Sequence, residues 1–372
     1  MMSKLIKITH LTSVHARYDT RIFLKQCTSL AKLQNYKVNL VVADGLGNES
    51  KNKIQIYDIG SSTGRFKRIF MTTKKIYKKA LDLNSDIYHI HDPELIHIGF
   101  KLKKNGKKVI FDSHEDVGED ILIKMWIPFL LRKLISLVYS FFEKYYCKKL
   151  DIVITATPHI REKFVIRGLN AIDINNFPIL SELTLGKNHW NEKKQEVCYI
   201  GAISKERGIL EIVNAIGNIE GVKLNLGGSF SEKELEKSCK KLDGWNNINE
   251  LGYLNQNEIS NVLKKSKAGL VVLYPTSTYK PSLPVKMFEY MASGIPIICS
   301  NFQLWNDMII TVYKCGIAVN PKDPKEIMDA INYIINHPEE SKEMGERGRK
   351  AVIEKYNWDN EERKLYSIYS NL

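Results

Sequence analysis

Two groups of residues in the second half of the chain have the types and spacing of a phosphate-binding site. The first is a glycine turn at Gly201, which follows a short apolar run and leads through Arg207 into a helical pattern. Such a turn offers backbone amides and a positive dipole to a phosphate, and an arginine adds a bidentate donor. The second is a short predicted helix in which Lys286 and Glu289 share one face. Lys286 can meet a phosphate and Glu289 can accept both hydroxyls of a ribose; a surface ion pair is the alternative.

Histidines recur where the short apolar runs of the first half end. His10, His91, His114 and His159 each end or follow such a run, and seven of the nine histidines precede residue 160. The carboxyl ends of parallel strands meet at one edge of a sheet, so we expect these side chains to line a polar cleft. A metal site at His89 and His91, which share one face of a strand, is the alternative, although no further ligand spacing supports it.

The elements that must position these residues alternate along the whole chain. Short β-branched runs, mostly apolar on both faces, are separated by longer helical patterns, which indicates parallel sheets covered by helices on both sides. In the first half we predict strands at 5–9, 38–43, 54–59, 87–91, 109–112, 152–155 and 172–175. In the second half we predict strands at 197–200, 223–226, 248–251, 269–273, 296–299 and 316–319. Two such series predict an α/β protein with two Rossmann-like domains.

A polar segment and individual proline, glycine and aspartate residues suggest where the domains and helices begin and end. The first domain is predicted over 1–180 and the second over 197–355, because the polar segment 181–196 shows neither helical nor strand periodicity. Pro284 suits the first turn of the helix that carries Lys286, and Gly294 suits its C-terminal cap. In the first domain, Asp19 is expected to cap a helix that begins near Thr20.

Composition sets the broad class of the protein. A chain of 372 residues with 44% hydrophobic and 26% charged residues is an ordinary globular protein of two domains, not a disordered, collagen-like or polytopic membrane chain. No cleavable leader is recognisable. Six scattered cysteines without a CxxC pair indicate reduced thiols of a cytoplasmic protein.

The positive charge is confined to the first half. Residues 1–180 hold 30 Lys and Arg against 17 Asp and Glu, whereas residues 181–372 hold 25 against 25. This excess of 13 suggests an anionic partner, namely a phosphorylated substrate, a membrane leaflet or nucleic acid, with a solvated lysine-rich surface as the alternative. The chain lacks a zinc finger and an RNP-type aromatic motif, which disfavours nucleic acid.

Several motifs together resemble the family 4 glycosyltransferases, retaining enzymes of GT-B fold. They are GAISKERGILEIVNAI from Gly201, LGYL from Leu251 and SLPVKMFEYMASGIPIICSNF from Ser282. HARYDTRIFLKQCTSLAK, HIHDPEL and FDSHEDV resemble the bacterial polysaccharide-assembly branch of that family. The resemblance implies two Rossmann-like domains facing across a cleft, with a C-terminal helix over 356–372 that crosses back to the first domain. It also implies retaining transfer from a UDP- or GDP-sugar to a polyprenyl-diphosphate-linked or other saccharide acceptor, in capsule or lipopolysaccharide O-antigen synthesis.

The resemblance also implies roles for individual residues. Glu289 matches the ribose-binding second Glu of the E-x7-E pattern, Arg207 takes the place of a diphosphate-binding Lys, and His114 matches a histidine beside the transferred sugar. Two departures stand out, since Pro281 replaces the first Glu of that pattern and Ala202 replaces an Arg. The predicted donor-binding residues are Gly201, Arg207, Gly252, Tyr253, Ser282, Lys286 and Glu289. The predicted catalytic residues are His114, Arg207 and Lys286, and the predicted acceptor-side residues are His15, Arg17, Asp19, Arg21 and His91.

No Asp-x-Asp pair occurs in the chain, so we expect neither a metal nor a resident cofactor. The stretch from Met125 to Leu150 mixes aromatic and basic side chains, as an interfacial helix on anionic lipid does. We therefore expect peripheral association with the inner face of the cytoplasmic membrane. Three alternatives remain open: a nucleotide-sugar 2-epimerase of similar fold, a non-catalytic nucleotide-sugar-binding subunit, and an NAD-dependent oxidoreductase, which would lack its G-x-G-x-x-G motif.

Overall fold

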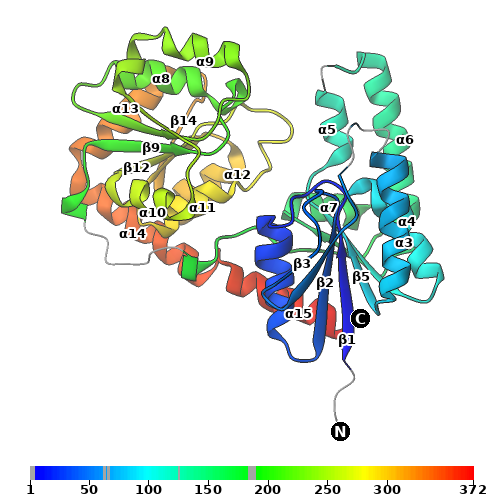
Figure 1. Cartoon of the computed structure of the whole chain (residues 1–372). Helices are drawn as coiled ribbons and strands as arrows, with labels where there is room; N and C mark the ends of the chain where they lie inside the picture. Colours follow the sequence, from blue (N-terminus) through cyan, green and yellow to red (C-terminus); the bar gives the residue numbers. More distant parts are fainter. Residues whose placement is uncertain (1–4, 62–63, 65–67, 125, 183–189) are drawn as a thin grey trace. The chain divides into compact units, whose positions relative to one another are not determined.

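The chain forms two separate units, each built around its own parallel sheet (Figure 1). The computed structural model describes residues 5–61, 64, 68–124, 126–182 and 190–372. Unit 1 comprises residues 1–176 and 360–372, and unit 2 comprises residues 177–359. The sequence placed these divisions at 180 and 355. Residues 183–189 of the predicted linker, and Met125 at the start of the predicted interfacial stretch, lie outside the described residues.

Unit 1 contains an eight-stranded sheet in the order β3-β4-β2-β1-β5-β6-β7-β8. Its strands are β1 (Ile6–Leu11), β2 (Tyr36–Val42), β3 (Glu49–Lys51), β4 (Ile54–Asp58), β5 (Ile87–Ile90), β6 (Lys108–Ser113), β7 (Ile152–Thr155) and β8 (Ala171–Asp173). All pairings are parallel except β3 with β4. The short edge strand β3 was not predicted, because its residues are polar and show no apolar alternation to mark a strand.

Helices cover both faces of this sheet. They are η1 (Thr20–Cys27), α1 (Thr28–Lys32), η2 (Arg68–Thr72), α3 (Thr73–Leu83), η3 (Pro93–Leu95), α4 (Ile96–Lys104), α5 (Val117–Ile123), α6 (Phe129–Cys147) and α7 (Pro158–Ile166). The last helix, α15 (Trp358–Ser370), belongs to unit 1 from Asn360 onward. Its Tyr366 hydroxyl donates to the carbonyl of Ser29 over 3.0 Å, and Glu362 pairs with Lys32 at 2.8 Å.

Unit 2 contains a six-stranded, fully parallel sheet in the order β11-β10-β9-β12-β13-β14. Its strands are β9 (Glu196–Ile200), β10 (Lys223–Gly227), β11 (Ile248–Gly252), β12 (Ala268–Val271), β13 (Ile297–Ser300) and β14 (Gly316–Val319). Its helices include η6 (Lys205–Arg207), α8 (Ile209–Gly217), α9 (Lys233–Lys240), α10 (Gln256–Lys265), α11 (Val285–Ala292), α13 (Pro324–Asn336) and α14 (Pro338–Glu354). Separate apolar clusters, such as those around Ile212 and Phe288, fill the spaces between helices and sheet.

Each of the thirteen predicted strands overlaps an observed one, so the predicted α/β fold of two parallel-sheet domains is confirmed. Leaving aside the antiparallel edge strand β3, the strand order of each sheet reverses direction once, between β1 and β5 in unit 1 and between β9 and β12 in unit 2. Ligands of open α/β sheets bind beyond the carboxyl ends of the strands at such a point. Candidate sites are therefore expected at these two edges.

Candidate active site

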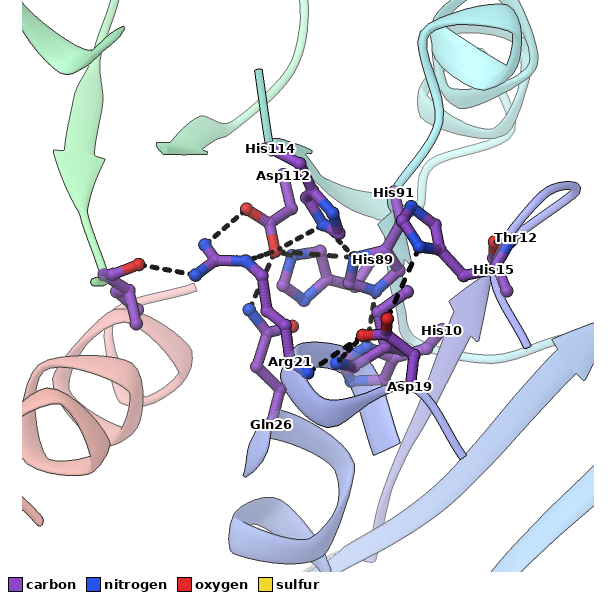
Figure 2. A network of polar contacts seen from close by, with 12 residues as sticks. His10, Thr12, His15, Asp19, Arg21, Gln26, His89, His91, Asp112 and His114 are labelled. Atoms are coloured by element: carbon purple, nitrogen blue, oxygen red, sulfur yellow. Dashed lines mark hydrogen bonds and ion pairs between the residues drawn. The ribbon is translucent and has the colours of Figure 1, made fainter. Parts of the chain in front are cut away.

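Asp112, in β6, is the centre of a buried polar network in unit 1 (Figure 2). Its carboxylate receives two hydrogen bonds from the Arg21 guanidinium, from Nε to Oδ2 over 2.9 Å and from Nη2 to Oδ1 over 2.7 Å. The Gln26 amide donates to the same Oδ2 over 2.8 Å. Burial alone would raise the pKa of Asp112, but the charges of Arg21 and His114 outweigh it and hold that pKa well below its usual value. Asp112 is therefore an ionised carboxylate matched to a buried cation.

Histidines at the ends of β1, β5 and β6 form a chain beside this ion pair (Figure 2). His10 Nδ1 lies 2.9 Å from His91 Nε2, and His91 Nδ1 lies 3.3 Å from His114 Nε2. Both His91 and His114 also approach Asp112 Oδ2, at 3.4 and 3.3 Å. Burial lowers the pKa of His91 to about 3 and lowers that of His10 and His89 as well. These buried rings are consequently neutral, and they connect the network through hydrogen bonds rather than through ion pairs.

The C-terminal helix completes the same network. The Tyr369 hydroxyl, on α15, lies 2.9 Å from His89 Nδ1 and 3.4 Å from His10 Nε2. The sequence analysis did not single out Tyr369, Gln26 or Asp112. For Asp112 a signal was available, since one carboxylate ends the otherwise apolar strand sequence VIFDS. Tyr369 offers no comparable signal, because its partners lie 280 and 359 residues away.

His15 and His114 bring the network to the surface. The His15 ring lies between Asp19, at 3.5 Å, and Asp92, at 3.4 Å, and its centroid is 4.7 Å from that of His114. The side chains of His15 and His114 are 28% and 17% exposed, so a ligand can reach both. Burial lowers the pKa of His15, but the hydrogen bond to Asp19 and the charge of Asp92 outweigh it and raise that pKa. As predicted, Asp19 caps helix η1, accepting from the amide nitrogen of Ile22 at 2.9 Å.

The other predicted acceptor-side residues contact partners within unit 1 rather than the exposed surface at His15 and His114. Arg17 forms a bidentate pair with Asp44, at 2.8 and 2.7 Å, and also contacts Glu49 at 3.1 Å, so it holds the loop before β3. Arg21 is engaged by Asp112, and its Nη1 donates to the Ile174 carbonyl over 2.7 Å. Because Arg17, Arg21 and the buried His91 are committed to partners inside unit 1, we assign them positioning roles.

Among the residues that the structure describes, two groups of side chains have ligand atoms close enough to hold a metal ion: His10, His89 and His91, and His91, Asp112 and His114. In the first group the His89 and His10 rings stack on His91, with interplanar angles of 25° and 13°. His10 Nδ1 and His91 Nε2 already form a hydrogen bond of 2.9 Å with each other, whereas tetrahedral ligands direct their nitrogens toward a common ion. In the second group an ion would compete with Arg21 for Asp112. Neither arrangement favours a metal.

The site of unit 2 begins with glycines at three neighbouring strand ends. The amide of Gly201, after β9, donates to the Gly227 carbonyl over 2.9 Å, and the amide of Gly228 donates to the Gly252 carbonyl over 2.7 Å. A Cβ at Gly228 would lie 1.9 Å from the Gly201 carbonyl oxygen, so the chain there must lack a side chain. Gly227 and Gly228 were not among the predicted site residues, although a Gly-Gly pair directly after a predicted strand was a signal.

Lys286 supplies a buried positive charge in the first turn of α11. Its Nζ lies 3.7 Å from the centre of the Tyr199 ring and has no hydrogen-bond partner among the described residues. Burial, and next the charge of Arg207, lower the pKa of Lys286 well below its ordinary value. The surface ion pair considered as an alternative is therefore wrong. Burial without a hydrogen-bonded anion favours the neutral form of this amine, and a bound anion would restore its charge, so the site suits an anionic ligand.

Arg207 lies beside the same tyrosine. A Cβ on Gly201 would be 4.0 Å from Arg207 Nη1, which puts the guanidinium along the glycine turn. Burial lowers the pKa of Arg207, but Tyr199 and Tyr279 outweigh it and raise that pKa. Gly208, next in the chain, has a φ of +65°, and a Cβ there would lie 2.7 Å from the Val272 carbonyl oxygen. The glycine thus lets Arg207 end helix η6 close to the sheet.

The remaining predicted donor residues lie further along α11, beyond β11 and in the segment before α11. Glu289 is half-buried, one turn further along α11 than Lys286. Tyr253 is 86% exposed beyond β11, and the Ser282 hydroxyl donates to the Tyr279 carbonyl over 2.8 Å.

The predicted ends of helix α11 were nearly right. Gly294, with a φ of +67°, follows its last turn, and its amide donates to the Met291 carbonyl over 2.9 Å. Pro284 precedes the first helical residue rather than lying in the first turn, since its ψ of 129° is extended.

Comparisons with known proteins bear on the family and the fold of the chain. Residues 182–351 match the family described as "Glycosyl transferases group 1". The chain is 21% identical over 299 residues to the D-rhamnosyltransferase WbpZ of Pseudomonas aeruginosa, covering 77% of this chain and 72% of that protein. It is 25% identical over 222 residues to the uncharacterized glycosyltransferase MJ1607 of Methanocaldococcus jannaschii, covering 57% of this chain and only 55%, about half, of that relative.

Among solved structures, Alr3699/HepE of Anabaena in complex with UDP and glucose matches with a TM-score of 0.74 at 13% identity. The match covers 99% of this chain and all of the other. Identity this low shows a shared fold only. Residues 182–351 are thus similar to the glycosyl transferases group 1 family, and the whole chain shares the two-sheet fold of HepE.

Proposed function

We propose that this protein is a retaining glycosyltransferase that moves a sugar from a UDP- or GDP-sugar to a lipid-linked saccharide in cell-surface polysaccharide synthesis. The observation that carries the proposal is Lys286, a buried amine without a hydrogen-bond partner among the described residues, beside Arg207 and the Gly201 turn. Two cations and glycine-walled strand ends suit the diphosphate of a nucleotide-sugar. HepE is described in complex with UDP and glucose, which supports the same donor class here.

In this proposal unit 2 binds the donor and stabilises its leaving group. Glu289 accepts the ribose hydroxyls, and Gly252 and Tyr253 border the base. As the bond from the sugar to the β-phosphate breaks, Arg207 and Lys286 neutralise the negative charge that develops on the phosphate. Because this charge is greatest in the transition state, the two cations raise turnover more than they raise ground-state affinity.

Unit 1 binds the acceptor in this proposal, and His15 and His114 contact the reacting sugars at its surface. The carboxylates at the same edge are poor nucleophiles, because Asp112 is paired with Arg21, Asp19 caps η1, and Asp92 accepts from Thr12 over 2.9 Å. The acceptor hydroxyl therefore attacks from the face that the diphosphate leaves, and its proton passes to the departing phosphate oxygen. Attack from that face retains the anomeric configuration.

Helix α6 supports a membrane-bound acceptor. Nine of its large apolar side chains are more than 40% exposed: Phe129, Leu130, Leu131, Leu134, Ile135, Leu137, Val138, Phe141 and Tyr145. The buried Glu143 fixes the helix to unit 1 through Lys163, at 2.9 Å, and Arg167, at 3.0 Å. In the part of the chain that the structure describes, no helix has the length and apolarity to cross a bilayer. We propose that α6 instead lies in the interface of an anionic leaflet.

Liposome co-sedimentation tests this docking. Anionic vesicles should bind the protein at low salt and release it at high salt, whereas neutral vesicles should not bind it, because each basic residue near an anionic surface contributes about 1 kcal/mol. The double variant Leu134→Glu, Phe141→Glu should abolish binding. The matched variant Leu81→Glu, Ile353→Glu, at two exposed apolar positions outside α6, should not. Failure to bind anionic vesicles at low salt would contradict the docking.

The activity itself is tested in two steps. A thermal-shift panel of UDP, GDP, CMP and their sugars, including deoxyhexose donors, should identify one nucleotide that raises the melting temperature. The protein is then incubated with that donor and a membrane lipid extract, and the anomeric configuration of the product is read by NMR. A product epimer formed without acceptor would instead indicate an epimerase. Nucleotide binding without any turnover would indicate a binding subunit.

A further inference from the structure

Unit 1 contains a cavity away from the strand-end site. It lies between helices η2 and α3 on one side and helices α4 and α6 on the other. Its volume is about 570 Å³, within the range of small-molecule sites. The apolar part of its wall comes from Ile69 and Phe70 of η2, Ile98 of α4 and Phe142 of α6. Ile98 is almost fully buried, whereas Phe70 is 69% exposed, so the pocket has an apolar floor and an open apolar rim. Such a wall binds hydrocarbon, not sugar.

Cations stand at the same pocket. Lys74 of α3 and Lys101 of α4 both line it and are exposed. The pocket's carboxylate, Glu94, is already committed, because its Oε1 accepts from Arg68 Nε over 2.8 Å and from the Ser13 hydroxyl over 2.9 Å. Two lysines beside an apolar cavity are complementary to an amphiphile with an anionic head, and a compact diphosphate would offer an oxygen to each.

Contacts connect this pocket to the reactive edge of unit 1. Ser13, which donates to Glu94, also lies 3.1 Å from Asp92, and Asp92 lies 3.4 Å from the exposed His15. On its other side the pocket includes Phe142, whose neighbours on the exposed face of α6 are Val138 and Phe141. The pocket thus lies between the histidine surface and the helix proposed to touch the bilayer.

We propose that this pocket binds the isoprenoid-diphosphate end of the acceptor. The first isoprene units lie against Ile98 and Phe142, the diphosphate lies between Lys74 and Lys101, and the remaining chain leaves along α6 toward the membrane. The proposal rests on the lipid-linked acceptor of the proposed function. It adds a site that selects that lipid, and it explains why the exposed apolar helix α6 lies beside the pocket.

Farnesyl diphosphate and inorganic pyrophosphate are the two probes, and calorimetry on the full chain measures their binding. Farnesyl diphosphate should bind at least about tenfold more tightly, because the pocket buries its hydrocarbon. The variant Lys74→Gln, Lys101→Gln should weaken its binding by about tenfold or more. The control Lys78→Gln, Lys104→Gln removes the same charge from the same two helices outside the pocket, and should change binding less than about twofold.

Equal affinity for both probes would overturn the proposal, and so would equal weakening by both double variants, since either result means that only surface charge attracts the diphosphate. Nucleotide binding and transfer to a water-soluble acceptor are measured on the same preparations. Transfer without farnesyl diphosphate binding would overturn the pocket alone. Specific farnesyl diphosphate binding without nucleotide binding would uphold the pocket and contradict the proposed donor chemistry.

Discussion

The two strand-end sites occupy the same place in the topology of their sheets but treat buried charge in opposite ways. In unit 1 the buried Arg21 is matched by the buried Asp112, with a bidentate geometry of 2.9 and 2.7 Å. In unit 2 the buried Lys286 has no hydrogen-bond partner in the described part of the chain; burial and then the charge of Arg207 lower its pKa, while the charge of Glu289 raises it.

This difference separates a site that is complete by itself from one that a ligand completes. Unit 1 uses its charges to hold neutral histidines in place, so that an uncharged hydroxyl group meets a fixed surface. Unit 2 leaves the buried Lys286 without a hydrogen-bonded anion, and in the proposed function a diphosphate supplies that anion. Loss of a charge should therefore destabilise unit 1, whereas in unit 2 it should impair function and stabilise the fold.

The largest expected effect is on stability in unit 1. Asp112→Asn leaves the Arg21 guanidinium buried without an anion, which should lower the free energy of unfolding by about 3–5 kcal/mol. Asp82→Asn, at an exposed position of α3, is the matched control and should change little. Urea unfolding measures both. The double variant Arg21→Met, Asp112→Leu removes both charges and should recover much of the loss; no recovery would show that the pair is not the cause.

The same ion pair predicts a pH dependence. Because the folded state lowers the pKa of Asp112 below its usual value near 3.8, this stabilisation is fully present above about pH 4 and is lost as the pH falls through the folded pKa. The wild-type protein should therefore lose stability in acid more steeply than Asp112→Asn does. Melting temperatures between pH 3 and pH 7 test this, and parallel curves would contradict it.

The next largest effect is on turnover in unit 2. Lys286→Met should lower the transfer rate by about 10²–10³, the cost of removing one donor that stabilises transition-state charge. The same substitution should raise the melting temperature of the ligand-free protein, because methionine fills the space without a buried charge. Lys264→Met, at an exposed position of α10, should change neither quantity. A drop in both activity and stability would mean that Lys286 is structural.

A smaller effect, on nucleotide affinity, is expected at Glu289, the residue proposed to bind the ribose. Glu289→Ala should weaken nucleotide binding by about 1–3 kcal/mol, the loss expected for a charged hydrogen-bond acceptor. Calorimetric titration with the preferred nucleotide measures it, and Glu346→Ala, at an exposed position of α14, serves as the control. Unchanged affinity in Glu289→Ala would remove the ribose role and leave the two cations as the donor contacts.

The sequence could predict features that depend on neighbouring residues, but not those that depend on contacts between residues far apart in the chain. Apolar β-branched runs mark strands locally, so all thirteen predicted strands are present, while the polar edge strand β3 was missed. Arg207, Lys286 and Gly201 lie in local motifs, so the sequence alone could single them out as candidate site residues. The partnership of Arg21 with Asp112 spans 91 residues, and that of Tyr369 with His89 spans 280, so no local pattern could reveal either. Tertiary packing alone decides that Arg21 pairs with a buried carboxylate while Arg207 lies beside tyrosines.

The smallest expected effect is that of metal removal. Arg207 and Lys286 supply positive charge at the proposed diphosphate site, so transfer should persist after exhaustive EDTA treatment at close to its untreated rate. The alternative ligands are in unit 1, where His91, Asp112 and His114 lie close enough for an ion but Arg21 already occupies the Asp112 carboxylate. Activity is assayed before and after EDTA, with and without added Mn²⁺. Complete loss that Mn²⁺ restores would contradict the proposed electrostatics. If His114→Ala then also abolished Mn²⁺ binding, the metal would belong to unit 1, and the contrast between a complete and an incomplete site would have to be reversed.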